Sequence, residues 1–475
     1  MVRGIIINNL GQADLEFMSS KRFNINLIYF GGVLLIIMLL MMVLGCDSSI
    51  TNLVATPTST VAATSTPRPN PTAIEGRATT TVVPTPTRTS DDGKINLILW
   101  TVAEISPEAE GGPGEFMRDS IRAFERSHPS VSVDVILKKS GGKGGVLDFL
   151  RTAKEVAPSV LPDVAIIDAT GLNQAYSEGL IQTLNGKLDR SIVQDLLPAA
   201  RRMGTIQDQL VGVPVGIEME HTVYNTLSFP EPPLLWSEVL TANTRYLFPA
   251  KGVNGLVNDL TLAQYFSAGG RLLDNEGAPT LDERVLQSVL ETYEQGVENG
   301  IIDPVMLEIS TVEEVWPSYA AGQASLAQTR VRQYLTDREL LSNTTFGPFP
   351  VQSNADTPVH IMHSWALVLV TDGQDVRRQA ATLSLIEWFM STNNNATWNN
   401  INKSIPTRNT SYQQLADDDS YWEFLAEQLN TAQPQPSFPG YDQLGRIIQQ
   451  AIVQVISGEA TAEEATTTAI DALDQ

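Results

Sequence analysis

Short apolar runs between residues 94 and 170 predict buried strands. They lie at 95–100, 131–135 and 162–168. In the second run valines alternate with polar residues, which is typical of a strand with one covered face. Between the runs, Met117, Ile121 and Phe124 fall on one face of a predicted helix, and a second helix is expected over 146–156. The order β-α-β-α-β predicts parallel strands joined by right-handed crossovers.

The rest of the chain repeats this mixture of short strands and longer helices, so we expect an α/β fold. A further buried strand is expected over 366–370. Helices are expected over 236–241, 262–268, 281–298, 312–321, 376–390, 447–456 and 462–473. The glycine- and proline-rich segment 110–114 is expected to form a loop. Because ligands bind beyond the carboxyl ends of parallel strands, 100–104 and 168–171 are expected to border a site.

A longer apolar run lies near the N-terminus, over 27–44, and follows Lys21 and Arg22. A basic segment, an apolar segment and small residues at a cleavage point are typical of a secretory signal. The run ends in Val-Leu-Gly before Cys46, which resembles the lipobox of bacterial lipoproteins, whose cysteine becomes the acylated first residue of the mature chain. We therefore expect a signal peptide over 1–45 and a fatty-acyl anchor such as palmitate on Cys46. An uncleaved transmembrane anchor is the alternative, because the run is about long enough to span a bilayer.

Both interpretations place the remaining chain on the extracytoplasmic face of the cell membrane. Residues 46–93 are expected to form a disordered tether, because 51–90 holds 13 Thr and 6 Pro and almost no large apolar side chain. The tether would hold the body, 94–475, away from the membrane. That body is long enough for two ordinary domains.

The net charge argues against two classes of binding partner, and the cysteine content excludes disulfides as a source of stability. The formal net charge of −23 argues against binding to nucleic acid or to an anionic lipid surface. Cys46 is the only cysteine, so no disulfide can form within the mature chain, and its stability must come from core burial.

No constellation of catalytic residues stands out, so we interpret the chain as a non-enzymatic protein without a cofactor. The sequence has no GxSxG motif, and the glycine-rich segment 141–145 lacks the spacing of a phosphate-binding loop. His360 and His363 have no third type of metal ligand nearby, so no metal site is expected. Abundant carboxylates leave a glycosidase-like acid pair open.

A series of short motifs extends over nearly all of 94–475. They are L-I-L-W at 97–100 with Glu104, F-E-R-S-H-P at 124–129, L-P-D-V at 161–164, Q-L-V-G-V-P at 209–214, Y-N at 224–225 with W-S-E-V-L at 236–240, G-I-I-D-P at 300–304, G-Q-A-S-L-A at 322–327 and S-I-P-T-R at 404–408. Their joint order resembles the family 1 extracellular solute-binding proteins, the group that includes maltose-binding protein. These proteins are the capture subunits of sugar ABC importers.

The resemblance implies two α/β lobes joined by a hinge, with a ligand cleft between them that closes on the ligand. Lobe one would take about 94–215 and 350–405, and lobe two about 220–345 and 410–475. It also implies a lipid-anchored substrate-binding subunit that captures a carbohydrate and delivers it to the membrane subunits of an ABC permease. A monomer is expected.

Sugar binding requires aromatic rings for the apolar face of a pyranose and polar groups for its hydroxyls. Trp100 and Trp365 flank apolar strands near predicted strand ends, and Tyr265 and Tyr441 are candidates from lobe two by family position. The polar candidates, which fall in segments that match the contact regions of the family, are Glu104, Asp168, Glu218 and Arg330. For the aromatic residues the alternative is a place in the core, and for the charged residues it is a solvated or structural role.

Other functions stay open at this point. The solute could belong to another class, such as a polyamine or a glycerol-phosphate compound. From outside the binding proteins, the alternatives are a secreted carbohydrate-active enzyme and a sensor that reports its ligand to a membrane kinase.

Overall fold

The computed structural model describes residues 93–370, 375–416 and 418–474, all of which belong to one compact unit. The expected signal peptide, Cys46 and the tether up to residue 92 lie outside the described residues. Within the described part, no helix is both long enough and apolar enough to cross a membrane.

The first of two large sheets has five strands in the order β2-β1-β3-β12-β6. Their bounds are β1 Ile95–Thr101, β2 Val131–Leu137, β3 Val164–Asp168, β12 Trp365–Leu369 and β6 Val213–Pro214. Strand β1 runs parallel to β2 and β3, whereas β12 runs antiparallel to β3 and β6. The parallel β-α-β-α-β unit expected from the sequence is therefore confirmed.

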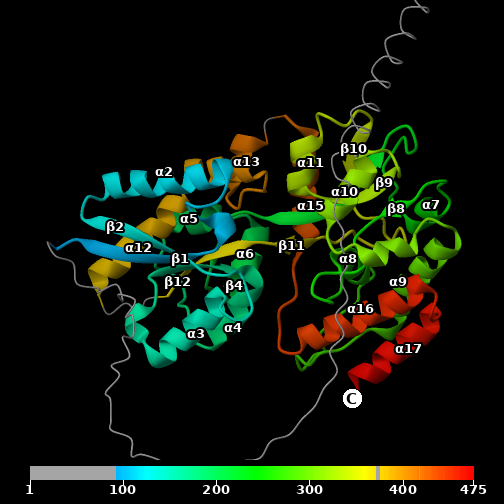
Figure 1. Ribbon diagram of the computed structural model, residues 1–475, viewed down its shortest axis with the longest axis horizontal. Helices are drawn as coiled ribbons and strands as arrows, with labels where there is room; N and C mark the ends of the chain where they lie inside the picture. The colour runs from blue at the N-terminus through cyan, green and yellow to red at the C-terminus, as the bar shows by residue number, and fades with distance from the viewer. Residues whose placement is uncertain (1–92, 371–374, 417, 475) are drawn as a thin grey trace, which may run out of the picture. The chain divides into compact units, whose positions relative to one another are not determined.

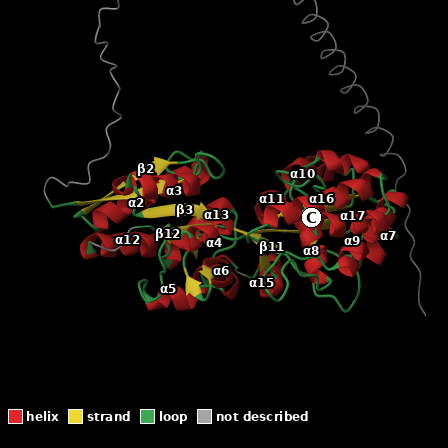
Figure 2. Ribbon diagram, turned by 90° about the horizontal axis from the view of Figure 1, so that it is seen from below, coloured by secondary structure: helices red, strands yellow, loops and turns green. Residues whose placement is uncertain are grey.

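Helices cover both faces of this sheet (Figures 1 and 2). Helices α2 (Gly111–Ser127) and α12 (Val376–Phe389) pack against each other on one face, and α3 (Val146–Val156) packs near β3 on the other. The apolar face predicted for α2 is buried, with Phe124 fully inaccessible to solvent. Burying an apolar stripe from each helix on the sheet gives this half of the body its own core.

The second sheet has the order β13-β11-β7-β9-β8, with β10 also paired to β7. Its strands are β7 Glu218–Asn225, β8 Tyr246–Leu247, β9 Leu326–Arg330, β10 Thr344–Gly347, β11 Ile361–His363 and β13 Gln433–Pro434. The helices around it include α8 Asp259–Ser267, α9 Glu283–Glu298, α10 Val312–Ala320, α11 Val331–Asp337, α16 Tyr441–Ser457 and α17 Ala462–Leu473. A second core, rich in aromatic side chains such as Trp236, Tyr246 and Tyr293, fills this half.

The remaining elements are shorter or lie beside the two sheets. They are α4 Leu172–Ser177, α5 Arg190–Asp195, α6 Pro198–Gly204, β4 Thr205–Ile206, β5 Gln209–Leu210, α7 Trp236–Leu240, α13 Thr392–Asn402, α14 Asn409–Leu415 and α15 Ser420–Thr431. The described residues also form short 3-10 turns at Ala103–Ile105, Pro158–Val160, Ala169–Gly171 and Pro304–Glu308. The helices expected from the sequence between 236 and 473 are all present, with ends that differ by a few residues.

The chain crosses between the sheets where β6 gives way to β7 and where β11 gives way to β12. A third segment joins them, because the backbones of Ile217 and Ile405 exchange hydrogen bonds of 2.8 and 2.9 Å. Gly216 has no room for a side chain, since a Cβ there would lie 2.2 Å from Oδ1 of Asn399. The body is thus a two-lobed α/β fold with adjacent crossovers.

The exact bounds of the lobes stay a prediction. Within the range 350–405 assigned to lobe one, β11 pairs in the second sheet and β12 in the first.

The expectation of a loop over 110–114 is wrong, because α2 already begins at Gly111. Proline is tolerated in the first turn of a helix, where the backbone N–H has no intrahelical partner. A Cβ on Gly112 would lie 2.9 Å from the Ile401 side chain, and one on Gly114 would lie 1.9 Å from the carbonyl oxygen of Ala109. These glycines therefore reflect close packing around a helix start and not a turn.

Candidate functional site

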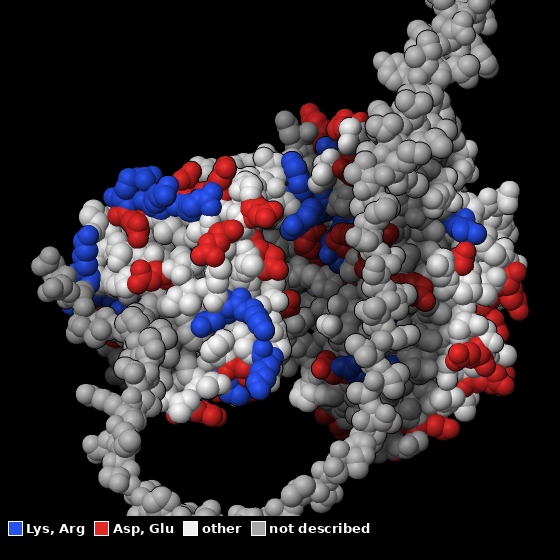
Figure 3. Space-filling view, viewed as in Figure 1, with Lys and Arg blue, Asp and Glu red and all other residues white. Residues whose placement is uncertain are grey.

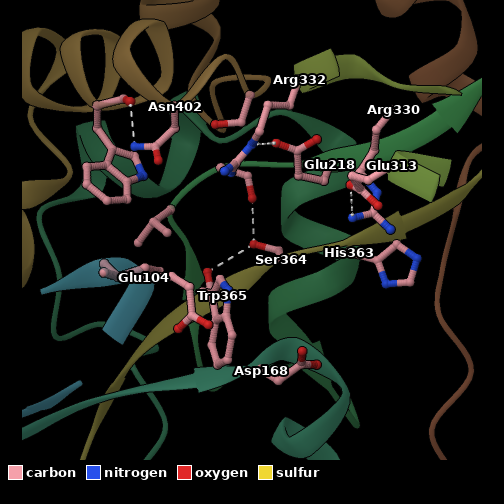
Figure 4. Close-up of a pocket in the computed structure, with 15 residues that line it drawn as sticks. Glu104, Asp168, Glu218, Glu313, Arg330, Arg332, His363, Ser364, Trp365 and Asn402 are labelled. Carbon is pink, nitrogen blue, oxygen red and sulfur yellow. Dashed lines mark hydrogen bonds and ion pairs between the residues drawn. The ribbon is translucent and has the colours of Figure 1, made fainter. Parts of the chain in front are cut away.

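A cavity of about 340 Å³ lies where the crossovers meet, and it is lined by residues of both lobes (Figure 4). The space-filling view shows the surface hollowed in this region, with acidic and basic side chains inside the recess (Figure 3). This volume falls within the range typical of small-molecule sites.

The lobe-one wall is built at the carboxyl ends of the parallel strands. Asp168 ends β3 and stands directly opposite Trp365, the first residue of the antiparallel β12. Directly opposed residues place their side chains on the same face of a sheet, so the carboxylate and the indole belong to one surface. Glu104 reaches this surface from the short turn after β1 and is exposed.

The end of α13 forms another part of the lining. Asn402 donates its side-chain N–H to the carbonyl oxygen of Trp398 at 3.0 Å, and the Ser404 hydroxyl donates to Oδ1 of Asn399 at 2.7 Å. Trp398 itself is largely buried and its ring packs on Phe116 at 5.8 Å between centroids. These contacts fix the amide and the hydroxyl beside the crossover.

The lobe-two wall holds a network of ion pairs. Arg330, at the end of β9, contacts Glu220 at 3.1 Å and Glu313 at 2.9 Å. Arg332 lies 3.4 Å from Glu218, the first residue of β7. Because Glu218 and Glu220 are two residues apart on one strand, they share a face, and the arginines meet them from β9 and α11. Oε2 of Glu218 is shielded from solvent and has no hydrogen-bond partner among the described residues.

A histidine adds a further charge to this wall. Nε2 of His363 lies 2.6 Å from Oδ2 of Asp259. Burial would lower the pKa of the imidazole, but the Asp259 carboxylate outweighs it and raises the pKa to about 9. His363 is therefore a cation at neutral pH.

The two glutamates respond to burial in the opposite sense. Burial raises the pKa of Glu218 to about 7, although Arg332 and Arg330 oppose the shift. Burial and the nearby Asp259 also raise the pKa of Glu220, against the pull of Arg330. Burial therefore disfavours the charged form of both glutamates, and the nearby arginines oppose this effect.

Comparison with known proteins shows the family to which this chain belongs. The family model described as bacterial extracellular solute-binding protein matches residues 120–426, which is more than half of the chain. The chain belongs to this family. The resemblance inferred from the order of short motifs is thereby confirmed.

Solved structures share the fold of this solute-binding protein. The sugar-binding protein MalE of Xanthomonas citri has a TM-score of 0.66 at 18% identity, covering 80% of this chain and 96% of its own. The cyclic alpha-maltosyl-1,6-maltose binding protein of Arthrobacter globiformis has a TM-score of 0.65 at 18% identity, covering 80% and 98%. A solute-binding protein of Thermotoga lettingae bound with alpha-D-tagatose has a TM-score of 0.60 at 19% identity, covering 80% and 98%.

The structure brings most of the expected site residues of this solute-binding protein into one cavity. The residues that line it are Glu104, Asp168, Glu218, Arg330 and Trp365. They come from four strands of the two sheets and from the turn after β1. Glu104 and Asp168 lie in the two strand-end segments that we expected to border a site. Contact of these residues with a ligand stays a prediction.

Trp100, Tyr265 and Tyr441 are not among the residues that line the cavity. Trp100 is 3% exposed and belongs to the core of lobe one, and the half-buried Lys138 places its ammonium 4.6 Å from the ring centroid. The Tyr265 hydroxyl accepts from the N–H of Asp282 at 2.6 Å and donates to the carbonyl oxygen of Arg271 at 2.8 Å. Tyr265 thus ties down the segment after α8.

Tyr441 is also buried, in the core of lobe two, at the start of α16 and against the ring of Phe438. Its hydroxyl is shielded from solvent and has no partner among the described residues.

Sequence reasoning missed several lining residues. These are Arg332, His363, Glu313, Ser364, Trp398, Asn402 and Ser404, with the apolar Ile105 and Val215 and the backbone of Gly216. His363 was considered only as a metal ligand, and the S-I-P-T-R motif marked the position of Ser404 without assigning it a role. Arg332 lies two residues beyond Arg330, at the end of a strand. This spacing was the signal in the sequence that could have indicated a second arginine at the site.

Proposed function

We propose that this protein is the substrate-binding subunit of a sugar ABC importer, which captures a carbohydrate between its lobes and delivers it to a membrane permease. The observation that carries the proposal is the composition of the interlobe cavity. It combines a part-exposed indole, Trp365, with carboxylates, guanidinium groups, an amide and a hydroxyl. A pyranose matches this combination, because it has an apolar face and a ring of hydroxyls.

Membership of the solute-binding family and the sugar ligands named in structures of the same fold support the proposal. Those structures share 14–19% identity with this chain and establish the common fold. The crossovers between the lobes also support closure by rotation about a hinge, as in other binding proteins that enclose a ligand.

The test is a thermal-shift screen of the purified protein against neutral sugars, amino sugars, polyamines and glycerol phosphates. A solute that binds only the folded state raises the melting temperature by mass action, by an amount that grows with its concentration. A saturable shift with a sugar is the expected result. A shift with a glycerol phosphate alone would replace the sugar importer with another solute class.

The proposal includes a lipid anchor on Cys46, which rests on the sequence resemblance to the lipobox and on the extracellular placement of the family. Cys46→Ala removes the thiol that would be acylated. The variant should remain an uncleaved precursor and should take up no radiolabelled fatty acid. A labelled Cys46→Ala protein would rule out this anchor.

A further inference from the structure

The two walls of the cavity differ in how their charges are balanced. On the lobe-two side, each cationic side chain that lines the cavity already faces a carboxylate. Arg330 pairs with Glu220 and Glu313, Arg332 with Glu218, and His363 with Asp259. On the lobe-one side, Glu104 and Asp168 have no cationic partner among the described residues. The cavity and its ion-pair partners therefore hold six carboxylates and three cations.

Asp168 is held in place but keeps a free oxygen. Its Oδ1 accepts from the backbone N–H and the hydroxyl of Thr170, at 2.8 and 2.5 Å. These contacts belong to the cap of the turn that follows β3, and they leave Oδ2 without a partner in the described structure. Glu104 makes no side-chain hydrogen bond or ion pair with the described residues, and its carboxylate stands near the Trp365 ring in Figure 4. The Trp365 ring thus lines the same cavity as two carboxylates that have no cationic partner in the described structure.

If the lobes closed over a neutral sugar, the negative charges of Glu104 and Asp168 on the lobe-one wall would have no positive charge to balance them. Hydroxyl groups can donate hydrogen bonds to both carboxylates, but the two negative charges would be withdrawn from water without a cation. Desolvating unpaired charges is costly, and pairing them with a hydrogen-bonding cation offsets that cost. An ammonium supplies several donors and a positive charge, and the face of an indole attracts it as well.

We propose that the solute is an amino sugar, whose protonated amino group binds between Glu104 and Asp168 while its ring stacks on Trp365. This inference rests on the proposed sugar-binding function and narrows it to a cationic class of carbohydrate. In this arrangement, Arg332 and the His363 imidazolium face the hydroxyls at the other end of the ring from the lobe-two wall. A polyamine shares the ammonium chemistry but lacks the ring, so it serves as a separate arm of the test.

The experiment is calorimetric titration of the full-length protein at neutral pH, where the amino group of an amino sugar is mainly protonated. The probes are glucosamine, galactosamine and the glucosamine dimer, each beside its neutral parent sugar and its N-acetyl form, together with spermidine. One of the amino sugars should bind at least about tenfold more tightly than both matched neutral forms, which is the scale of one charge-assisted hydrogen bond. That preference should shrink as salt is added.

Variants locate the effect in the cavity. Asp168→Asn keeps the oxygen that caps the turn, and Glu104→Gln keeps the size of an exposed side chain. Each should weaken binding of the amino sugar about tenfold while changing the affinity for its neutral parent much less. Glu108→Gln is the control, because Glu108 is an exposed carboxylate of the same loop that does not line the cavity. An equal loss for both ligands would assign Glu104 and Asp168 to general hydroxyl binding and overturn the inference.

The outcomes separate this inference from the proposed function. A neutral sugar that binds as tightly as its amino form overturns the inference and leaves a sugar-binding protein. Binding of spermidine without any sugar supports recognition of an ammonium and overturns the carbohydrate function. Failure of every amine in this set overturns the inference, and the wider thermal-shift screen then decides the function by itself.

Discussion

The two walls of the cavity use the same types of side chain in different ways. In lobe two, Glu218 and Glu220 are at least partly buried and form ion pairs with arginines. Arg330 at the end of β9 pairs with Glu220, and Arg332 in α11 pairs with Glu218. In lobe one, Glu104 and Asp168 stand at strand ends with free oxygens. A group that is already paired contributes mainly to the stability of the fold, whereas an unpaired group in a cleft is available to a ligand. The comparison therefore assigns most of the fold stabilisation to the lobe-two wall and recognition of the amino group to the lobe-one wall.

The largest expected effect tests the structural half of this comparison. Arg330→Ala would leave Glu220, whose side chain is 6% exposed, without its ion-pair partner. We expect the free energy of unfolding to fall by about 3 kcal/mol, the lower part of the range for one-sided removal from a buried pair, since Arg330 itself is about one-third exposed. Urea denaturation measures this change.

Arg332→Ala is the matched control for that experiment. Its side chain is 56% exposed and its contact with Glu218 is long, so its removal should cost less than about 1 kcal/mol. If Arg330→Ala lost no more stability than the small amount expected for Arg332→Ala, the pairing of Arg330 with Glu220 would not stabilise the lobe-two wall.

The next effect tests the recognition half. Trp365→Ala should weaken sugar binding by about 2–4 kcal/mol, as for an aromatic hot spot, with little change in the free energy of unfolding. Trp236→Ala is the comparison, because Trp236 is 2% exposed in the lobe-two core, and its removal should cost about 3–5 kcal/mol of stability. Calorimetric titration and a denaturant melt on each variant separate the two effects. Normal affinity in Trp365→Ala would remove this indole from the binding surface.

The sequence predicted the fold further than it predicted the site. Strands such as 95–100 and 162–168 were recognisable because a strand buried on both faces has a continuous run of apolar residues. The order of the short motifs indicated the family. The cavity depends on which segments meet in space. Asp168 and Trp365 are neighbours only because β12 adds antiparallel to β3 almost 200 residues later. Asn402 and Ser404 reach the cavity because Ile405 pairs with Ile217, and no local pattern reports that contact.

A smaller effect concerns the pH dependence of the lobe-two wall. Burial raises the pKa of Glu218 from its ordinary value of 4.5 to about 7, so the folded state favours the protonated carboxyl. The stability that this group contributes is fully present below about pH 4.5 and is lost as the pH rises through about 7. Relative to the wild type, Glu218→Gln should therefore gain on the order of 1–3 kcal/mol between these limits, because it has no charge to bury.

Urea melts of both proteins across this pH range measure the difference. Glu108→Gln serves again as the control, since that carboxylate is exposed and its substitution should change stability by the same small amount at every pH. A difference between Glu218→Gln and the wild type that does not vary with pH would mean that Glu218 is well solvated.

The smallest expected effect is at Trp100, the aromatic residue that we expected in the site and that lies in the core of lobe one instead. Trp100→Phe keeps an aromatic ring against Phe149, whose centroid is 6.3 Å away, and removes an indole N–H that is shielded without a partner in the described structure. The loss of packed volume is offset in part by the removal of that donor, so the free energy of unfolding should change by less than about 1.5 kcal/mol. Because Trp100 does not line the cavity, the affinity for the sugar should match that of the wild type in calorimetric titration. A marked loss of affinity with unchanged stability would place Trp100 beside the ligand and would extend the recognition wall behind Glu104.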